Sequence, residues 1–278
     1  MWDDALVLLS TDNGGMTKWG WNNETESPTW PASVGANAPL RGGKSTLFEG
    51  GVRCTALITG GKNVILDKAR GKPYAGLMHA ADLFAIAYGA ATNGSSAQHV
   101  DGLNLLPQVL SGEPSLRDNL PLNINYHGLD FTGIIWINGT RKWKLIVGGA
   151  LTIPGSDGYY GLGGVDAAPA PPLRTTHNLF ELAADPYEKS ECSQEHPDVV
   201  MHGLRLLRDH MAAGYRQPQP NLPHVRSWPA FHGGAWAPFL GDDEPVHEHD
   251  LVQDGGYEER EMYQVNIDVD KLDAFAFT

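Results

Sequence analysis

The residues with the clearest chemical potential stand just after an apolar run. Residues 5–9 are all apolar, and Asp12, Asn13, Gly14 and Gly15 follow within a few positions. A carboxylate beside an amide oxygen can ligate a hard cation such as Ca²⁺ or Mg²⁺, and the two glycines would let the backbone turn sharply and come close to a ligand. Taken alone, Asp-Asn-Gly-Gly is more often a simple turn, so the cation site is a hypothesis that other residues must support.

Three basic residues form a second group. Lys44 follows Gly42 and Gly43, and Arg41 and Arg53 flank the same stretch. A lysine in this setting presents a point charge to an anionic group such as sulfate or phosphate. Taken singly, a solvated lysine is the commoner finding, and internal ion pairing is a further structural explanation for the two arginines.

Histidines and cysteines offer weaker candidates. His79 and Asp82 could form a catalytic pair, but a capping aspartate with a structural histidine is the commoner arrangement. A His-Glu-His run at 247–249 could bind metal adventitiously. The chain has two cysteines, Cys54 and Cys192, too few for a disulfide framework. Two free buried thiols and one bridge remain the alternatives.

The N-terminal stretch has the character of an α/β protein. The apolar run at 5–9 predicts a strand buried on both faces, as in a parallel sheet. Open α/β sheets place ligand sites beyond the carboxyl ends of their strands, which is where Asp12 lies. Residues 16–38 predict a long surface loop, 55–59 a second strand, and 77–91 a helix because that stretch is rich in helix formers.

The pattern changes at about residue 115. Apolar stretches at 134–137 and 143–147 flank Asn138-Gly139, a favoured pair for a tight hairpin turn. Residues 178–182 predict a short strand.

The remaining C-terminal stretches differ in periodicity. Residues 150–175 are rich in glycine and proline and predict a loop. An amphipathic helix is predicted over 197–213 from the apolar positions Val200, Leu204, Leu207 and Met211. From residue 214 onward no periodicity is recognisable.

Composition narrows the function classes. The net charge of −13 over 278 residues disfavours nonspecific nucleic-acid binding, because phosphate contacts need a basic face. No stretch is apolar for long enough to predict a membrane span, and the first residues do not show the pattern of a signal peptide. Sequons at Asn23, Asn93 and Asn138 are weak evidence for a secretory route.

Considered together, the motifs resemble those of the type I sulfatase family, close to the arylsulfatase B type, over about residues 1–240. The resemblance rests on their order along the chain: Ser10-Thr11-Asp12-Asn13-Gly14-Gly15, Pro39-Leu40-Arg41-Gly42-Gly43-Lys44, Glu49-Gly50-Gly51-Val52-Arg53, Leu77-Met78-His79-Ala80-Ala81-Asp82, Asp101-Gly102-Leu103-Asn104, Trp143-Lys144-Leu145-Ile146, Leu179-Phe180-Glu181-Leu182, Asp185-Pro186-Tyr187-Glu188 and Trp236-Ala237-Pro238. Each motif alone is unspecific, whereas the ordered set is highly specific.

The resemblance implies an α/β fold of the alkaline-phosphatase-like sulfatase type, with a partial central sheet and a smaller C-terminal antiparallel subdomain carrying a helix. It predicts the C-terminal part of the catalytic domain at 1–115, the antiparallel subdomain at 116–240, and an acidic tail of unassigned role at 241–278. Without the N-terminal strands of the family's central sheet, apolar edges would be left uncovered.

The resemblance also implies residue roles. Asp12 and Asn13 match the family's second pair of ligands to a divalent cation, usually Ca²⁺, and Lys44 matches the lysine that binds the substrate sulfate group. Two ligands are well short of the roughly 6 to 8 oxygens that Ca²⁺ takes, so weak binding is expected. The loop between Asn13 and Lys44 is longer than is usual in the family.

The family's nucleophile is not recognisable in these residues. Sulfatases use a hydrated formylglycine made from the cysteine of a Cys-x-Pro/Ala-x-Arg motif. One of its hydroxyls attacks sulfur, the alcohol leaves, and the bound sulfate is then eliminated. Cys54 and Cys192 are followed by other residues, and Asp3-Asp4 precedes an apolar strand where the family's first metal pair follows one. We therefore expect no aryl sulfate hydrolysis by this chain alone.

Three functional hypotheses result. The first is a sulfuric ester hydrolase of the arylsulfatase type, acting on a sulfate ester or sulfated sugar and represented here by its C-terminal portion. The second is a non-catalytic protein that binds sulfated glycans. The third is a phosphate-ester hydrolase of the same superfamily, which the run from Pro39 to Lys44 disfavours. The family resemblance implies a secretory, lysosomal or extracellular location.

Overall fold

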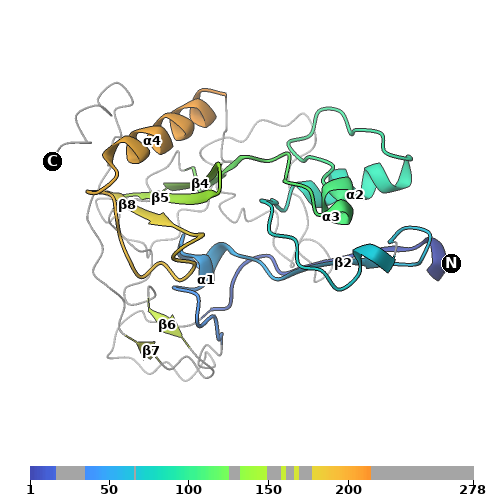
Figure 1. The fold of residues 1–278 in the computed structure, drawn as a ribbon, viewed down its shortest axis with the longest axis horizontal. Coiled ribbons are helices and arrows are strands. Elements are labelled where there is room, and N and C mark those ends of the chain that lie inside the picture. The colour runs from blue at the N-terminus through green and yellow to red at the C-terminus, as the bar shows by residue number, and fades with distance from the viewer. Residues whose placement is uncertain are drawn as a thin grey trace, which may run out of the picture.

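A computed structural model describes residues 1–16, 35–65, 67–124, 132–148, 158–160, 166–168 and 177–213. Figure 1 shows β1, β2, α2 and α3 at one end of the molecule and α4 with β4, β5 and β8 at the other. The elements in chain order are η1 (Trp2–Asp4), β1 (Leu6–Ser10), α1 (Glu49–Val52), β2 (Ala56–Gly60), η2 (Asp67–Ala69), α2 (Asp82–Ala91), α3 (Leu106–Ser111), β3 (Asn119–Leu122), β4 (Thr132–Asn138), β5 (Arg141–Val147), β6 (Tyr159–Tyr160), β7 (Asp166–Ala168), β8 (His177–Glu181) and α4 (Pro197–Ala212).

A four-stranded antiparallel sheet, in the order β3-β4-β5-β8, forms the C-terminal part. The predicted hairpin of β4 and β5 is confirmed, and so is the strand β8. Asn138 pairs with Arg141, so the turn residues are Gly139 and Thr140, one position later than predicted. Gly139 has a φ of 62°, a left-handed conformation that glycine adopts without steric cost.

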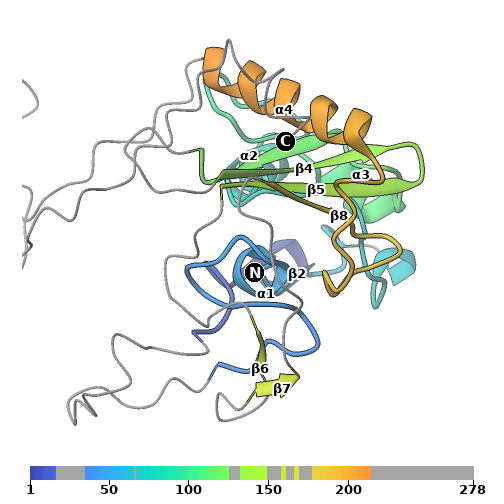
Figure 2. The same cartoon turned by 90° about the vertical axis from the view of Figure 1, so that its left-hand side faces the viewer.

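The two faces of this sheet bury different sets of side chains, because successive residues of a strand point to opposite sides. Figures 1 and 2 show α4 on one face and α1 on the other. The face toward α4 contains Ile134, Trp136, Trp143, Leu145 and Leu179. The face toward α1 contains Leu120, Ile135, Ile146 and Phe180, packed against Leu47 and Phe48. Both faces are covered, so a charged side chain in the middle of this sheet is buried.

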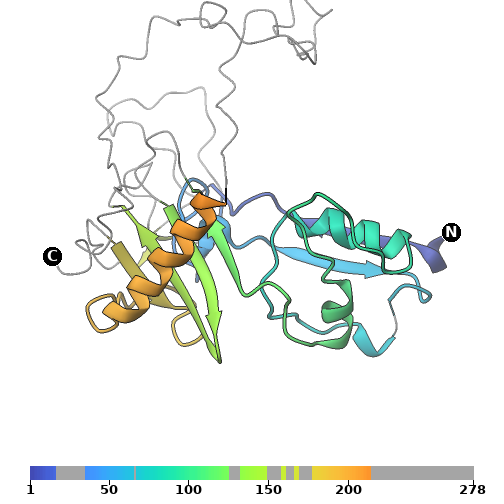
Figure 3. The same ribbon diagram turned by 90° about the horizontal axis from the view of Figure 1, so that it is seen from above.

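Helix α4 confirms the predicted amphipathic helix. Its buried side is formed by Val200, Leu204 and Leu207, which pack on the sheet. At Gly203 a Cβ atom would lie 2.9 Å from both Trp136 and Leu145, so the missing side chain lets the helix approach the strands closely. Figure 3 shows the helix running diagonally across the sheet.

Strands β1 and β2 confirm both predicted N-terminal strands but correct their arrangement. They pair antiparallel, with Leu6 opposite Gly60 and Ser10 opposite Ala56, and not as the parallel sheet predicted. The reason is that the segment between them closes on itself. Thr11 donates its N–H to the carbonyl of Thr55 at 3.0 Å. The chain therefore leaves and re-enters this ribbon at the same end.

The prediction that the first strand is buried on both faces is also wrong in the described structure. Leu6, Leu8 and Ile58 pack against the apolar side chains of α2 and α3. On the opposite face, Val7 is 38% and Leu9 61% exposed. The described helices therefore cover only one side of the ribbon.

Several remaining expectations are corrected or lie outside the described residues. Helix α2 begins at Asp82 and not at residue 77, because a turn at 79–82 precedes it. The predicted loop at 150–175 contains the short antiparallel pair β6 and β7. Most of the loop at 16–38 lies outside the described residues, as do the Trp-Ala-Pro motif at 236–238 and the His-Glu-His run. No helix of the described residues is long and apolar enough to cross a membrane. The domain boundaries stay a prediction.

Candidate functional site

The Asp12 segment lies where the chain leaves β1, at the tip of the ribbon. Asp12 is exposed, and its Oδ1 accepts a hydrogen bond from the Asn13 N–H at 2.8 Å. The Asn13 amide group donates to the Gly14 carbonyl at 2.7 Å. These bonds shape the turn and leave Asp12 facing solvent, where its carboxylate is accessible to a cation.

Lys44 lies on a second loop beside the first. Its backbone N–H donates to the Gly15 carbonyl at 3.1 Å. Its side chain is exposed, and in the described part of the chain no ion pair or hydrogen bond joins it to Asp12 or Asn13. The structure thus brings together the two loops that carry these predicted site residues without pairing their charged groups.

Asn37 connects the two loops, a role that the sequence did not reveal. Its side-chain Oδ1 accepts from the Gly15 N–H at 2.9 Å, and its Nδ2 donates to the carbonyls of Gly15, at 2.8 Å, and Gly42, at 3.1 Å. The side-chain amide therefore pairs with backbone groups of both segments. No local motif marked Asn37, because one of its partners, Gly15, lies 22 residues earlier in the sequence.

Gly14 and Gly50 allow neighbouring backbone segments to approach each other closely, because they lack a Cβ atom. A Cβ on Gly14 would lie 1.7 Å from the carbonyl oxygen of Gly50, and the Gly14 N–H donates to Gly51 at 2.9 Å. A Cβ on Gly50 would lie 2.5 Å from the Arg41 carbonyl oxygen. We predicted that Gly14 allows close approach to a ligand. In the described structure its close neighbour is α1.

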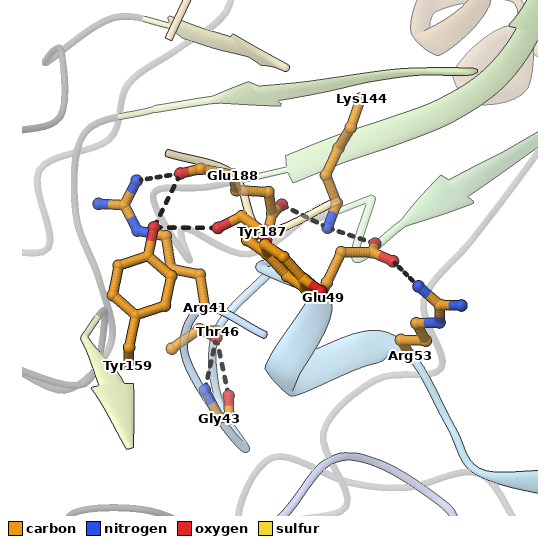
Figure 4. Close-up of polar contacts among 9 residues, drawn as sticks. All are labelled: Arg41, Gly43, Thr46, Glu49, Arg53, Lys144, Tyr159, Tyr187 and Glu188. Atoms are coloured by element: carbon orange, nitrogen blue, oxygen red, sulfur yellow. Dashed lines mark hydrogen bonds and ion pairs between the residues drawn. The ribbon is translucent and has the colours of Figure 1, made fainter. Parts of the chain in front are cut away.

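A buried ion cluster joins Glu49, at the end of the segment that begins with Arg41, to Lys144 and Glu188 (Figure 4). Lys144, on β5, directs its ammonium between two carboxylates, at 2.9 Å from Glu49 Oε1 and 2.8 Å from Glu188 Oε1. All three residues are buried. The sequence contained a signal for this cluster, because Lys144 is a charged residue within an apolar strand that the fold covers on both faces. Only the structure identifies its partners.

Glu188 takes part in the cluster with its backbone as well as its side chain. Its carbonyl accepts from the Arg41 guanidinium at 3.0 Å and from the Tyr159 hydroxyl at 3.3 Å. Its carboxylate also accepts from the Glu49 N–H at 2.7 Å. The backbone φ of 56° is in the left-handed region, which is costly for a residue with a side chain. The surrounding contacts hold it there.

The cluster shifts the pKa values of its members. Burial raises the pKa of Glu188, and the neighbouring Glu49 adds to this, so that it reaches about 7 despite the opposing effect of Lys144. Burial is the largest influence on Glu49 and opposes its ionisation, but Lys144 together with Arg53 and Lys142 outweighs burial and lowers the pKa of that carboxyl. Burial would lower the pKa of Lys144, yet the two carboxylates raise it. The lysine therefore stays charged, and Glu188 is the member that takes up a proton near neutral pH.

Both arginines of the predicted basic group contact other residues of the chain. Arg41 is buried, with its guanidinium 4.2 Å from the centre of the Phe48 ring. Arg53 lies 3.7 Å from Glu49 and is largely exposed. Of the three predicted basic residues, Lys44 alone keeps its side chain unpaired among the described residues.

Asp82 has a structural role, but it is not the predicted helix cap, because Ala81 is the N-cap of α2 and no side-chain capping bond is formed. Asp82 is buried, and its carboxylate accepts from the N–H groups of His79, at 2.7 Å, and Leu103, at 2.8 Å. It also pairs with the Arg117 guanidinium, with Nε at 3.1 Å. Burial and then Arg117 lower the pKa of the His79 imidazole. Through these contacts the Asp82 carboxylate stabilises the turn before α2.

The cysteines and metal-ligating residues add no second site among the described residues. Cys54 and Cys192 are free thiols, so the alternative of a bridge is excluded. Burial and acidic neighbours raise the pKa of Cys192 to about 11. No group of three or more His, Cys, Asp and Glu residues in the described ranges could hold a metal ion. Asp12 and Asn13 thus fit a hard cation in donor type, but they supply only two ligands.

Comparisons with known proteins identify relatives of this arrangement. No family model matches the chain. It is 26% identical over 263 residues to arylsulfatase J of Mus musculus, covering 87% of this chain and 40% of that protein. It is 26% identical over 259 residues to steryl-sulfatase of Mus musculus, covering 88% and 40%. It is 28% identical over 258 residues to N-acetylgalactosamine-6-sulfatase of Homo sapiens, covering 85% and 42%.

The fold supports the same relationship. The crystal structure of the protein Ps i-CgsB matches 79% of this chain and 38% of its own, with a TM-score of 0.51 and 21% identity. The chain spans about two fifths of the length of the curated relatives it matches. The predicted resemblance to sulfatases and the α/β fold with a C-terminal antiparallel subdomain are therefore both confirmed. The chain is therefore similar to sulfatases and matches the C-terminal part of these relatives.

Proposed function

We propose that this chain supplies one side of the active site of a sulfuric ester hydrolase, on the loops at 12–15 and 42–46. The observation that carries the proposal is their juxtaposition. Backbone hydrogen bonds and Asn37 hold the loops together, while Asp12 and Lys44 remain exposed. An exposed carboxylate and an exposed ammonium on adjacent loops suit a cation and an anionic substrate group bound side by side.

Each residue has a separate role in this proposal. Asp12 and Asn13 would offer two oxygens to a divalent cation such as Ca²⁺. Lys44 would place its ammonium against a sulfate oxygen as a point charge. A bound cation would stabilise the negative charge that builds on the sulfate oxygens during hydrolysis. Lys44 would support the same charge from the other loop.

The substrate class follows from what the relatives' names share. Arylsulfatase J, steryl-sulfatase and N-acetylgalactosamine-6-sulfatase are named for different alcohols but for the same sulfate group. The residues proposed here would contact the sulfate and the cation. We therefore propose a sulfate ester substrate, with a sulfated sugar as one possible alcohol component.

These 278 residues contain no Cys-x-Pro/Ala-x-Arg motif for a formylglycine nucleophile. We therefore expect binding without turnover from this chain alone. The test is a titration of the purified chain with CaCl₂ and with sodium sulfate, followed by amide NMR shifts at constant ionic strength. Ca²⁺ is expected to move the resonances at 12–15 with a Kd of about 1 mM or weaker, and sulfate those around Lys44.

Two variants make this test specific. Asp12→Asn should weaken the Ca²⁺ response, and Lys44→Ala should abolish the sulfate response, each leaving the other response in place. Lys62→Ala is a matched control, because Lys62 is an exposed lysine in an ion pair with Asp3 and away from both loops. Unchanged shifts at both loops in the wild-type chain would refute the proposal. Calcium-dependent hydrolysis of an aryl sulfate that Asp12→Ala abolishes would refute the expected lack of turnover.

A non-catalytic role in binding sulfated glycans is the second candidate. It is favoured by an exposed Lys44 in a chain without the nucleophile motif. Saturable binding of a sulfated oligosaccharide, lost in Lys44→Ala and accompanied by no turnover in a longer form of the protein, would favour this function over the hydrolase.

A further inference from the structure

The segment that carries Lys44 is anchored at both ends on a single residue. At its start, the buried Arg41 donates to the Glu188 carbonyl, and at its end the Glu49 N–H donates to the Glu188 carboxylate. Glu188 belongs to the loop between β8 and α4, far away in sequence. The two ends of the 41–49 segment are therefore fixed by the C-terminal subdomain (Figure 4).

Lys144 makes this anchor electrostatically stable. Its ammonium bridges Glu49 and Glu188, one carboxylate from each part of the molecule. A buried carboxylate without a partner is strongly disfavoured. Glu188 therefore depends on Lys144, whereas Glu49 also has Arg53 at 3.7 Å. Ile146, two residues further along β5, lies on the same face and packs in the core that includes Leu47 and Phe48 of the segment itself.

Further hydrogen bonds fix the 42–46 loop between these two ends. The Gly42 N–H donates to the Gly158 carbonyl at 2.8 Å, next to Tyr159, whose hydroxyl contacts the backbone of Glu188. The Thr46 hydroxyl donates to the Gly43 carbonyl at 2.8 Å. Lys44 lies between these fixed points, followed by Ser45 with a left-handed φ of 73°. A non-glycine residue keeps such a conformation only where its surroundings impose it.

We infer that Lys144 and Glu188 are positioning residues for Lys44, holding its loop from the C-terminal subdomain at the distance and orientation that anion binding needs. The inference rests on the proposed function for what Lys44 binds, but the anchoring of the loop is measurable without any ligand. The C-terminal subdomain thereby becomes part of the site without contributing a group that touches the substrate.

The test compares substitutions at Glu188 in the full chain by amide hydrogen exchange and by sulfate titration. Glu188→Ala removes both carboxylate oxygens but leaves the pair between Lys144 and Glu49. Exchange at the amides of 42–50 is expected to accelerate about tenfold or more, with a parallel loss of sulfate affinity. Glu188→Gln keeps one acceptor oxygen and should fall between wild type and Glu188→Ala in both measurements.

Lys144→Met is the stronger variant, with Lys62→Met as its control at an exposed ion pair. Because Lys144→Met removes the cation of the buried Glu188 carboxylate and could fail to fold, the two Glu188 variants decide the question. Unchanged exchange at 42–50 in Glu188→Ala would overturn the inference. An equal acceleration at the amides of α2 would do so too, because it would indicate a general loss of stability.

The proposed function and the positioning role of Glu188 can be refuted separately. If wild type does not bind sulfate, the proposed function fails, while the exchange rates still decide whether the loop is anchored. If wild type binds sulfate, and Glu188→Ala accelerates loop exchange without weakening that binding, the positioning role fails and the proposed function stands.

Discussion

Two neighbouring regions differ in the surroundings of their charged groups. One is the buried cluster of Glu49, Lys144 and Glu188, and the other is the pair of exposed loops with Asp12 and Lys44. In the cluster every charged group has a charged partner within 3 Å. On the loops, the carboxylate and the ammonium have no ion pair among the described residues. Removing an ion from water costs several kcal/mol unless a partner compensates, whereas an exposed ion needs none. The contrast separates charges that hold the fold from charges that remain available to a ligand.

The largest effect on the free energy of unfolding is expected from a substitution in the buried cluster. Lys144→Met is expected to lower the free energy of unfolding by about 3–5 kcal/mol, because it leaves the buried Glu188 carboxylate without its cation and Glu49 with only the exposed Arg53 at 3.7 Å. Urea unfolding of wild type and variant measures the difference. Lys62→Met should change stability by less than about 0.5 kcal/mol, since its ion pair is exposed. Equal losses in the two variants would contradict the importance of burial.

A smaller loss of unfolding free energy is expected from a substitution where the 12–15 loop contacts α1. Gly14→Ala would place a Cβ 1.7 Å from the Gly50 carbonyl oxygen, which forces the 12–15 loop away from α1. We expect a loss of about 2–3 kcal/mol in unfolding free energy and weaker Ca²⁺ shifts at Asp12. Gly71→Ala is the control. It has a positive φ but nothing near its Cβ, so it should cost only about 1 kcal/mol.

The pH dependence of stability offers a finer test of the cluster. The pKa of Glu188 is about 7 in the folded protein, above the ordinary value of 4.5, so the folded state holds a proton that the unfolded state has lost between these values. Stability relative to Glu188→Gln should therefore rise as the pH falls from about 7 to about 5, by at most about 1.4 kcal/mol per pH unit.

This comparison uses the difference between the two proteins because other groups titrate in the same range. The pKa values of His79 and His210 are lowered, mainly by burial, and they reduce stability as the pH falls below their unfolded values. That contribution is common to both proteins and cancels. Thermal or urea unfolding at several pH values measures the difference, and parallel stability curves for wild type and Glu188→Gln would contradict the raised pKa.

The smallest effect on stability is expected on the exposed side. Lys44→Ala should change the unfolding free energy by less than about 0.5 kcal/mol, since the side chain is exposed and unpaired among the described residues. The same variant should lose sulfate binding. A loss of stability comparable with that of Lys144→Met would show that Lys44 is structural and remove it from the candidate site.

Local sequence patterns predicted much of the C-terminal subdomain. The β4–β5 hairpin depends on two apolar stretches around a glycine turn, and α4 depends on an apolar repeat every three to four residues. Both patterns are contained within one element, so neighbouring residues suffice to recognise them. The pairing of β1 with β2 was predicted wrongly, because an apolar run indicates a strand but not the direction of its partner.

The sequence by itself revealed the resemblance to sulfatases, through the order of its motifs, and it marked Asp12, Asn13 and Lys44 as candidate site residues. Only the tertiary structure decided which charges are buried and how the loops meet. Lys144 finds Glu49 across 95 residues and Glu188 across 44, and Asn37 reaches Gly15 across 22. Such contacts depend on the path of the whole chain and on which faces of the sheet are covered, neither of which is encoded in a local pattern.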